Sequence, residues 1–203
     1  WNPGTTQEIF SLEELVEAFT LERVGKSGAK FDLEKAIWFN QHYLRNKSNQ
    51  ELGTLLMPLV SDHDVCLEYV EDVAGLMKER ASFIKDMLDG TYLFVNPTEF
   101  DAKTIKKKWK ENAEEIIAEL AKRFDSITDF TAENIEASFK AFLEEKELGM
   151  GAVLPLFRLV VTGKGMGPSM FDIAALLGKD FVLPRMEANS KLISTLKQTA
   201  AQS

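Results

Sequence analysis

Apolar residues recur at helical spacing along almost the whole chain, and this pattern constrains the fold most. A helix repeats every 3.6 residues and a strand every two, so apolar positions three and four apart indicate helices. Little two-residue alternation occurs anywhere in the 203 residues. A strand competes only over Val153–Val161, where branched residues are frequent, but Pro155 and the lack of a second strand favour a helix there. The sequence therefore predicts an all-α fold.

Capping signals predict where several of these helices begin. Ser11 with Glu14 three places on is a capping-box pattern, and Asp32 precedes a second helical pattern. The first helix is expected to bury one face, made of Phe10, Leu12, Leu15, Val16 and Phe19. Further helical patterns cover 48–88, 101–124, 131–149, 169–178 and the residues from 180 onward.

The stretch Met150–Glu187 combines an apolar run, a glycine loop and a capped helix. Arg158 is the single cation of the apolar run. The loop Thr162–Pro168 has glycine at 163, 165 and 167, so its backbone can approach a partner closely. Its G-x-G-x-G spacing, without alternating strands and helices, excludes a dinucleotide site. Two interpretations stay open: the loop packs two helices together, or it contacts a ligand beside Arg158.

Composition and charge exclude several function classes. With 45% hydrophobic and 28% charged residues the chain has the balance of a globular protein. No apolar run approaches the roughly 20 residues that span a bilayer, so no membrane partner is expected. The net charge of −8, from 24 basic and 32 acidic residues, argues against a general nucleic-acid coat but not against a local basic patch. The single cysteine, Cys66, rules out an intrachain disulfide and favours a cytoplasmic setting.

Neither a catalytic constellation nor a metal site stands out in the sequence. The densest group of potential metal ligands is Asp62, His63, Asp64 and Cys66. Its spacing fits no common site, and we interpret it as a polar turn. The sequence Gly25-Lys26-Ser27 resembles the end of a phosphate loop, but Thr20 stands where the leading glycine is required. We expect no catalytic residue, metal or cofactor in this chain.

Lysines crowd the first half of the helix expected over 101–124. They are Lys103, Lys106, Lys107, Lys108 and Lys110, and the second half of the same helix is acidic. In a single helix this order opposes the macrodipole, which favours anions at the start and cations at the end. Phosphate binding is one reason for such lysines, and a solvated face is the alternative.

Three blocks of the sequence together resemble one protein family. The first two are Glu8–Val24 and Ser27–Leu44, and the third is the stretch 150–187 with its Leu-Val-Val-Thr-Gly and Ala-Leu-Leu-Gly-Lys runs. In content and order they closely resemble the C-terminal half of bacterial glutamyl-tRNA synthetase. The resemblance covers nearly the whole chain, although between about 90 and 148 only the helix pattern agrees.

The resemblance implies a domain organisation and a role. Residues 1–45 would end a stem-contact region, and 46–100 and 101–203 would be two helical subdomains of an anticodon-binding domain. The parent enzyme is a class I glutamate–tRNA ligase, which attaches glutamate to its tRNA (tRNA-Glu) with ATP and Mg²⁺. The His-Ile-Gly-His and Lys-Met-Ser-Lys type signatures of that enzyme do not occur here, so this chain should not be catalytic. The resemblance implies that it binds tRNA-Glu as a cytoplasmic monomer.

The resemblance also implies candidate RNA contacts. Arg80 and Arg158 match positions where the family places anticodon-reading arginines, and a guanidinium can both stack on an unpaired base and bond its edge. Lys164 in the glycine loop and Lys106, Lys107 and Lys108 are further candidates for RNA binding. Apart from the resemblance, the acidic balance and amphipathic helices are equally typical of a helical protein–protein interaction domain.

Overall fold

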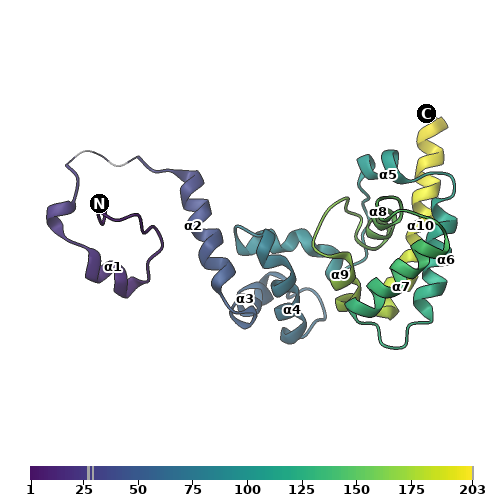
Figure 1. Ribbon diagram of the computed structural model, residues 1–203, viewed down its shortest axis with the longest axis horizontal. Coiled ribbons are helices and arrows are strands. Elements are labelled where there is room, and N and C mark those ends of the chain that lie inside the picture. Colours follow the sequence, from purple (N-terminus) through teal and green to yellow (C-terminus); the bar gives the residue numbers. More distant parts are fainter. Residues whose placement is uncertain (27, 29, 203) are drawn as a thin grey trace.

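The computed structural model describes residues 1–202 except Ser27 and Ala29, so the end of the Gly-Lys-Ser sequence lies outside the described residues. In the part that is described, every regular element is helical, and the all-α prediction is confirmed. The α-helices run along an elongated molecule, from α1 at one end to the C-terminus of α10 at the other (Figure 1). No helix described here is both long and apolar enough to cross a membrane.

The α-helices are α1 (Leu12–Ala18), α2 (Leu33–Asn46), α3 (Asn49–Leu56), α4 (Leu67–Met77), α5 (Ala102–Lys108), α6 (Ala113–Asp125), α7 (Ala132–Glu145), α8 (Met150–Thr162), α9 (Met170–Leu177) and α10 (Lys179–Gln202). The 3₁₀ helices are η1 (Leu21–Arg23), η2 (Met57–Leu59), η3 (Lys78–Arg80) and η4 (Ile84–Leu93). Val153–Val161 lies within α8, as the helix interpretation predicted.

The core has a smaller part around α3 and a larger part around α10. Helix α3 packs against α4 and η4, and Leu52, Leu56 and Val73 are fully buried there. Helix α10 packs along α6 and α8, while α7 packs against α6 and α9 (Figure 1). Contacts between α4 and α9 connect the two parts. The division into subdomains at residue 100 stays a prediction.

The single helix expected over 101–124 is wrong, because the chain breaks after Lys108. Helix α5 ends there, and α6 begins at Ala113. Between them Trp109 is buried, and its indole Nε1 donates to the hydroxyl of Ser194 in α10 at 3.2 Å. A continuous helix would carry on past Trp109 in a fixed direction, whereas the break lets its large ring reach α10.

The face expected to be buried on the first helix is exposed instead. No residue of α1 is buried, and Leu12 and Val16 are 73% and 70% exposed. The Ser11 and Glu14 capping box is present as predicted. The only aromatic contacts here join Trp1 to Phe10 and to Phe19, so in the described chain the apolar stripe of α1 has no core to pack on.

Arg185 ties three separate segments together inside the larger part of the core. Its side chain is 4% exposed, and its Nε donates to Oδ1 of Asn96 at 2.6 Å. Its Nη1 donates to the carbonyls of Tyr92 at 2.5 Å and Val161 at 3.3 Å, and Nη2 donates to the carbonyl of Val95. Arg185 therefore links the end of η4, helix α8 and helix α10.

Gly163 turns the chain from α8 into the glycine loop. It has φ of 71°, the left-handed region that favours glycine. A Cβ there would also lie 2.3 Å from the carbonyl oxygen of Glu99, and the Gly163 carbonyl accepts a bond from the amide of Asp101 at 2.8 Å. The loop is thus held against the residues that lead into α5.

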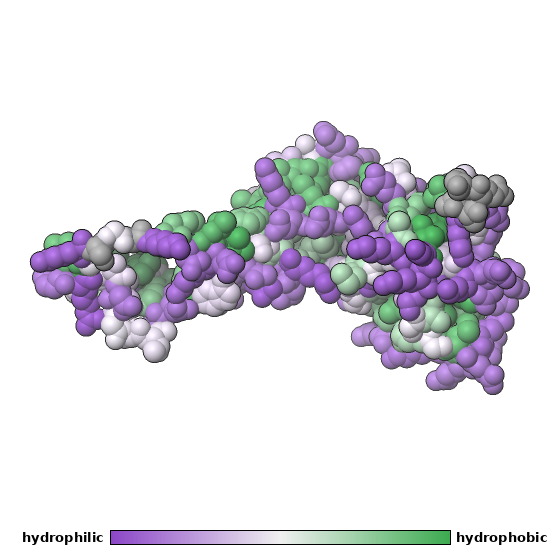
Figure 2. Space-filling model, turned by 90° about the horizontal axis from the view of Figure 1, so that it is seen from above, coloured by the Kyte–Doolittle hydropathy of each residue, from purple (hydrophilic) through white to green (hydrophobic). Residues whose placement is uncertain are grey.

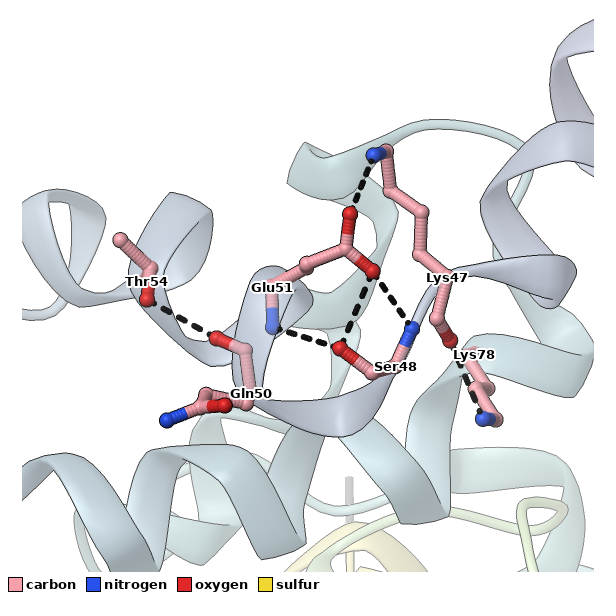
Figure 3. A network of polar contacts seen from close by, with 6 residues as sticks. All are labelled: Lys47, Ser48, Gln50, Glu51, Thr54 and Lys78. Atoms are coloured by element: carbon pink, nitrogen blue, oxygen red, sulfur yellow. Dashed lines mark hydrogen bonds and ion pairs between the residues drawn. The ribbon is translucent and has the colours of Figure 1, made fainter.

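A capping box fixes the start of α3 (Figure 3). The carboxylate of Glu51 accepts bonds from the Ser48 amide at 2.9 Å, the Ser48 hydroxyl at 3.0 Å and the Lys47 ammonium at 3.0 Å. The Ser48 amide contributes most to lowering the pKa of Glu51, which falls to about 2, and Lys47 and the Ser48 hydroxyl add to this.

Replacing Arg185 with Met should destabilise the protein by about 2 to 4 kcal/mol, because buried carbonyls lose their donor. Urea unfolding measures this free energy. Lys191→Met is the matched control on the same helix, since the Lys191 side chain is 64% exposed and forms a surface ion pair with Glu187. A loss in Arg185→Met no larger than in the control would contradict the linking role.

The carboxyl of Glu51 should titrate near pH 2 in the folded protein rather than near 4.5. Since the folded pKa is depressed, the stability that the charged form contributes is complete above about pH 4.5 and is lost as the pH falls through about 2. A titration of the Glu51 side-chain carbon by NMR measures the pKa. In Ser48→Ala the pKa should rise, and an unperturbed wild-type value would be incompatible with the capping box.

Candidate nucleic-acid interface

Three of the predicted RNA contacts come together around one pocket. The pocket has a volume of about 320 Å³ and lies between η3, η4 and the glycine loop. It is lined by Met77, Arg80, Asp86, Asp89, Tyr92, Lys164, Met166, Gly167 and Pro168. Arg158 reaches the same place from α8, because its Nη1 would lie 2.8 Å from a Cβ on Gly167. Segments 60 residues and more apart in sequence thus build a single site.

The guanidinium of Arg158 has one terminal nitrogen with a hydrogen-bond partner and one without. Its Nη2 donates to the carbonyl of Pro168 at 2.7 Å. Its Nη1 is the one buried side-chain nitrogen or oxygen without a hydrogen-bond partner in the part of the chain that the structure describes. Burial is the main reason that the pKa of Arg158 lies below its ordinary value. Even so, an arginine keeps its charge at neutral pH, so the site holds a half-buried cation with a free donor.

Arg80 brings a second positive charge to the pocket. It ends η3 and is exposed. Repulsion from Arg80 also contributes to lowering the pKa of Arg158, so the two guanidinium groups are electrostatically coupled. Within the described residues the Arg80 side chain has no hydrogen bond and no ion pair, which leaves its donors open to a partner.

The glycine loop is attached to Arg158 at both ends. At its start the Thr162 hydroxyl donates to the carbonyl of Arg158 at 2.7 Å and accepts from the amide of Lys164 at 3.1 Å. At its end the Pro168 carbonyl accepts from the Arg158 side chain. The exposed side chain of Lys164 lies on the pocket wall, and Met166 is 85% exposed. The loop therefore packs helices together and also forms one wall of the site.

Two carboxylates offset part of the positive charge. Oδ2 of Asp86 accepts from the amides of Ser82 and Phe83, both at 2.8 Å, so this carboxylate caps η4. Asp89 is exposed and also lines the pocket. Against these two anions stand Arg80, Arg158 and Lys164, so the pocket keeps an excess of positive charge.

Lys106, Lys107 and Lys108 do not line this pocket. They form the last turn of α5, and Lys107 and Lys108 line a different hollow beside α8. The ammonium of Lys108 donates to the carbonyl of Gly151 at 2.9 Å. Because α5 ends at Lys108, the macrodipole favours these cations, and the acidic residues Glu114 and Glu115 start α6. The expected conflict with the dipole was wrong, because the lysines end one helix and the acidic residues start another. RNA binding by these lysines stays a prediction.

Sequence reasoning missed Tyr92 and Arg185. Burial is the main cause of the raised pKa of Tyr92, whose ring lines the pocket. Arg185 shows a weaker form of the signal that singled out Arg158, since it is the single cation of the short apolar run 181–186. Only the structure separates them, since Arg185 uses its nitrogens on neutral acceptors in the core while Arg158 keeps Nη1 free.

A larger pocket of about 540 Å³ lies between the turn at 62–66, η4 and the start of α10. It holds the predicted polar turn with Asp62 and Asp64, and its one cation is Arg185. No group of three or more His, Cys, Asp or Glu residues suited to a metal is found among the described residues. Its two carboxylates and committed arginine make this pocket a poorer match for RNA than the one at Arg158.

Comparisons with known proteins show which family the chain belongs to. The sequence model of the anticodon binding domain matches residues 51–189. The glutamate–tRNA ligase of Phocaeicola vulgatus is 47% identical over 92% of this chain and 37% of its own length. The glutamate–tRNA ligase of Flavobacterium psychrophilum is 44% identical over 97% of this chain and 39% of its own.

Solved structures agree as well. A glutamate tRNA ligase from Elizabethkingia meningosepticum, solved in complex with its amino acid, matches with a TM-score of 0.88 and 36% identity over 95% of this chain. The glutamate–tRNA synthetase of Elizabethkingia anophelis matches with a TM-score of 0.84 and the same identity. This chain covers 39% and 38% of those two chains.

The sequence model covers more than half of the chain, and the relatives confirm the resemblance to glutamyl-tRNA synthetase, which is another name for glutamate–tRNA ligase. The chain spans about two fifths of the length of the curated relatives that it matches. It therefore belongs to the anticodon-binding-domain family.

Proposed function

We propose that this chain is the part of a glutamate–tRNA ligase that binds tRNA-Glu and reads its anticodon. The observation that carries the proposal is the pocket where Arg80 and Arg158 meet Lys164, with one buried donor left open. Attachment of glutamate with ATP and Mg²⁺ would take place in a catalytic part outside this chain. The two family signatures that hold ATP are absent from the sequence.

The chemistry of the pocket suits an unpaired RNA loop. Proteins read RNA sequence mainly where bases are splayed out of a helix, by stacking and by bonds to base edges. A planar guanidinium can do both. Arg158 is half-buried, so a bond from its Nη1 forms where little water competes, while the exposed Arg80 and Lys164 can attract the RNA backbone.

The N-terminal residues support a role within a larger protein. Helices α1, η1 and α2 belong to an arm formed by the first part of the chain (Figure 1). Large apolar side chains of these elements are exposed, and hydrophobic residues appear in green on the surface of the arm in Figure 2. Leu21 and Phe31 are 76% and 77% exposed. Soluble domains rarely leave so many neighbouring apolar groups uncovered. We infer that another part of the ligase packs on residues 1–45, as expected for the end of a stem-contact region.

We further propose that the chain acts in the cytoplasm, in keeping with its single cysteine. We also propose that it acts as a monomer. The competing role is a helical protein–protein interaction domain, which the exposed apolar arm would also serve. Salt dependence separates the two. Binding of RNA phosphates weakens steeply as salt rises, whereas an apolar interface does not.

Arg158→Ala should weaken binding to the native anticodon stem-loop by about 1 to 3 kcal/mol, with a smaller loss on a loop whose anticodon is changed. The difference arises because a base contact depends on the base, unlike a backbone contact. Fluorescence anisotropy at fixed salt measures both affinities. Arg123→Ala, which removes a surface arginine paired with Glu145, is the charge-matched control. Equal losses on the two loops would show that Arg158 contacts the RNA backbone and not a base.

Replacing Lys106, Lys107 and Lys108 by Gln should weaken binding to all tRNAs alike and flatten the dependence of affinity on salt, if these lysines contact phosphates. Titrations between about 50 and 200 mM salt give the slope. Replacing Lys140, Lys146 and Lys191, which pair with acidic residues elsewhere, changes the net charge equally. The same slope in wild type and in the α5 variant would assign its lysines to a solvated face.

A further inference from the structure

Gly167 stands where a side chain would displace Arg158. A Cβ built on Gly167 would lie 2.8 Å from Nη1 of Arg158 and 3.6 Å from the hydroxyl of Tyr92. The first distance is shorter than side-chain carbons tolerate, and the atom it meets is the end of a flexible side chain. Gly167 is not among the residues with positive φ. Its backbone conformation thus suits alanine, and the guanidinium would be the group to move.

The position of the Arg158 guanidinium depends on the absence of a side chain at Gly167. Nη2 is fixed by the Pro168 carbonyl, directly after Gly167 in the chain. Nη1 is then directed past Gly167, in the neighbourhood of the Tyr92 ring, and it meets no acceptor of the described chain. A buried donor without a partner is costly, by about 1 to 3 kcal/mol. An incoming acceptor would remove that cost, so the pocket is prepared for one.

Building on the tRNA-binding function proposed above, we propose that Gly167 is a positioning residue. Its missing Cβ makes room for the guanidinium of Arg158, which places Nη1 to donate to an acceptor atom of a nucleobase. Burial favours a base over a phosphate as the partner of Nη1, because bringing a charged and strongly hydrated phosphate to a buried donor costs more desolvation than bringing a neutral acceptor. The carboxylates of Asp86 and Asp89 in the same pocket offset part of the positive charge that would attract a phosphate. A neutral base edge brings an acceptor without adding a third anion to these two carboxylates.

The geometry separates this role from a structural one. Adding a methyl group at Gly167 should leave the fold intact and move only the guanidinium, because the clash is with the tip of a side chain. Gly151 is the matched control, since a Cβ there has no neighbour within 4 Å. Both variants should keep the thermal midpoint of the wild type to within a few degrees.

The test measures binding of the 203-residue chain to anticodon stem-loops in which each anticodon nucleotide is made abasic in turn. At one position the loss of the base should weaken wild-type binding about tenfold or more. At that position the same change should have less than about a threefold effect in Gly167→Ala and in Arg158→Ala, since the contact is already gone. Gly151→Ala should behave like wild type. Stem-loops in which one neighbouring phosphate is replaced by a neutral methylphosphonate test in the same way whether Nη1 contacts a phosphate.

Each outcome has one meaning. Wild-type binding in Gly167→Ala, with Arg158→Ala still impaired, overturns the positioning role while leaving the proposed function in place. A second outcome is that a methylphosphonate weakens wild-type binding but has little effect in the two variants, while the abasic changes weaken all three proteins equally. Nη1 would then donate to a phosphate, and the base assignment would fail. Absence of binding by the wild type at low salt would refute the proposed function itself. Loss of the thermal transition in Gly167→Ala would show a structural role for this glycine and also overturn the inference.

Discussion

The arrangement of the site depends on the buried guanidinium of Arg185. It binds carbonyls at the end of η4 and in α8, and an amide oxygen of Asn96, so three segments distant in sequence meet on one side chain of α10. Its neutral acceptors do not cancel its charge, and burial is the reason that its pKa lies below the ordinary value. Such a group is tolerated only when its hydrogen bonds are satisfied. The carbonyl that Arg185 holds at Tyr92 belongs to the residue that forms one wall of the pocket at Arg158.

Two arginines of this domain differ in how far their donors are used within the protein. Arg185 has neutral oxygens around it, and its donors are used inside the protein. Arg158 donates from Nη2 to the carbonyl of Pro168, and its Nη1, for which the missing side chain of Gly167 makes room, has no acceptor among the described residues. Nη1 of Arg158 is buried without an acceptor, which is unfavourable, and a ligand that brings an acceptor would remove this cost. Arg80 and Lys164 add charge that is exposed, and so sensitive to salt, around this point.

Much of the fold followed from local patterns in the sequence. The all-α class, the capping box at Ser11 and the helix across Pro155 are all present. The break at Trp109 was missed because it depends on a contact with Ser194, 85 residues away, although Asn112 ahead of Glu114 and Glu115 is a helix-start signal. The burial expected for α1 failed for a related reason, since an amphipathic pattern shows that a face needs a partner but not where that partner is.

The candidate site was predictable in part. The family resemblance singled out Arg80 and Arg158, and Lys164 was a further candidate; the fold brings all three to one pocket. Sequence alone could not distinguish Arg158 from Arg185, because the number of acceptors within reach is set by packing between distant segments. The argument from the helix dipole for the lysines of α5 assumed one helix over 101–124, whereas the structure has two, α5 and α6. Whether any of these side chains contacts RNA stays a prediction.

The most direct test of the central claim is to observe the arginine side chains by NMR while an anticodon stem-loop of tRNA-Glu is added. The signals of the Arg158 Nη1 protons should move downfield and become protected from exchange with water, because the open donor gains an acceptor. Those of Arg185 should stay where they are, since its bonds are already made. Unchanged Arg158 signals at saturating RNA would contradict the account.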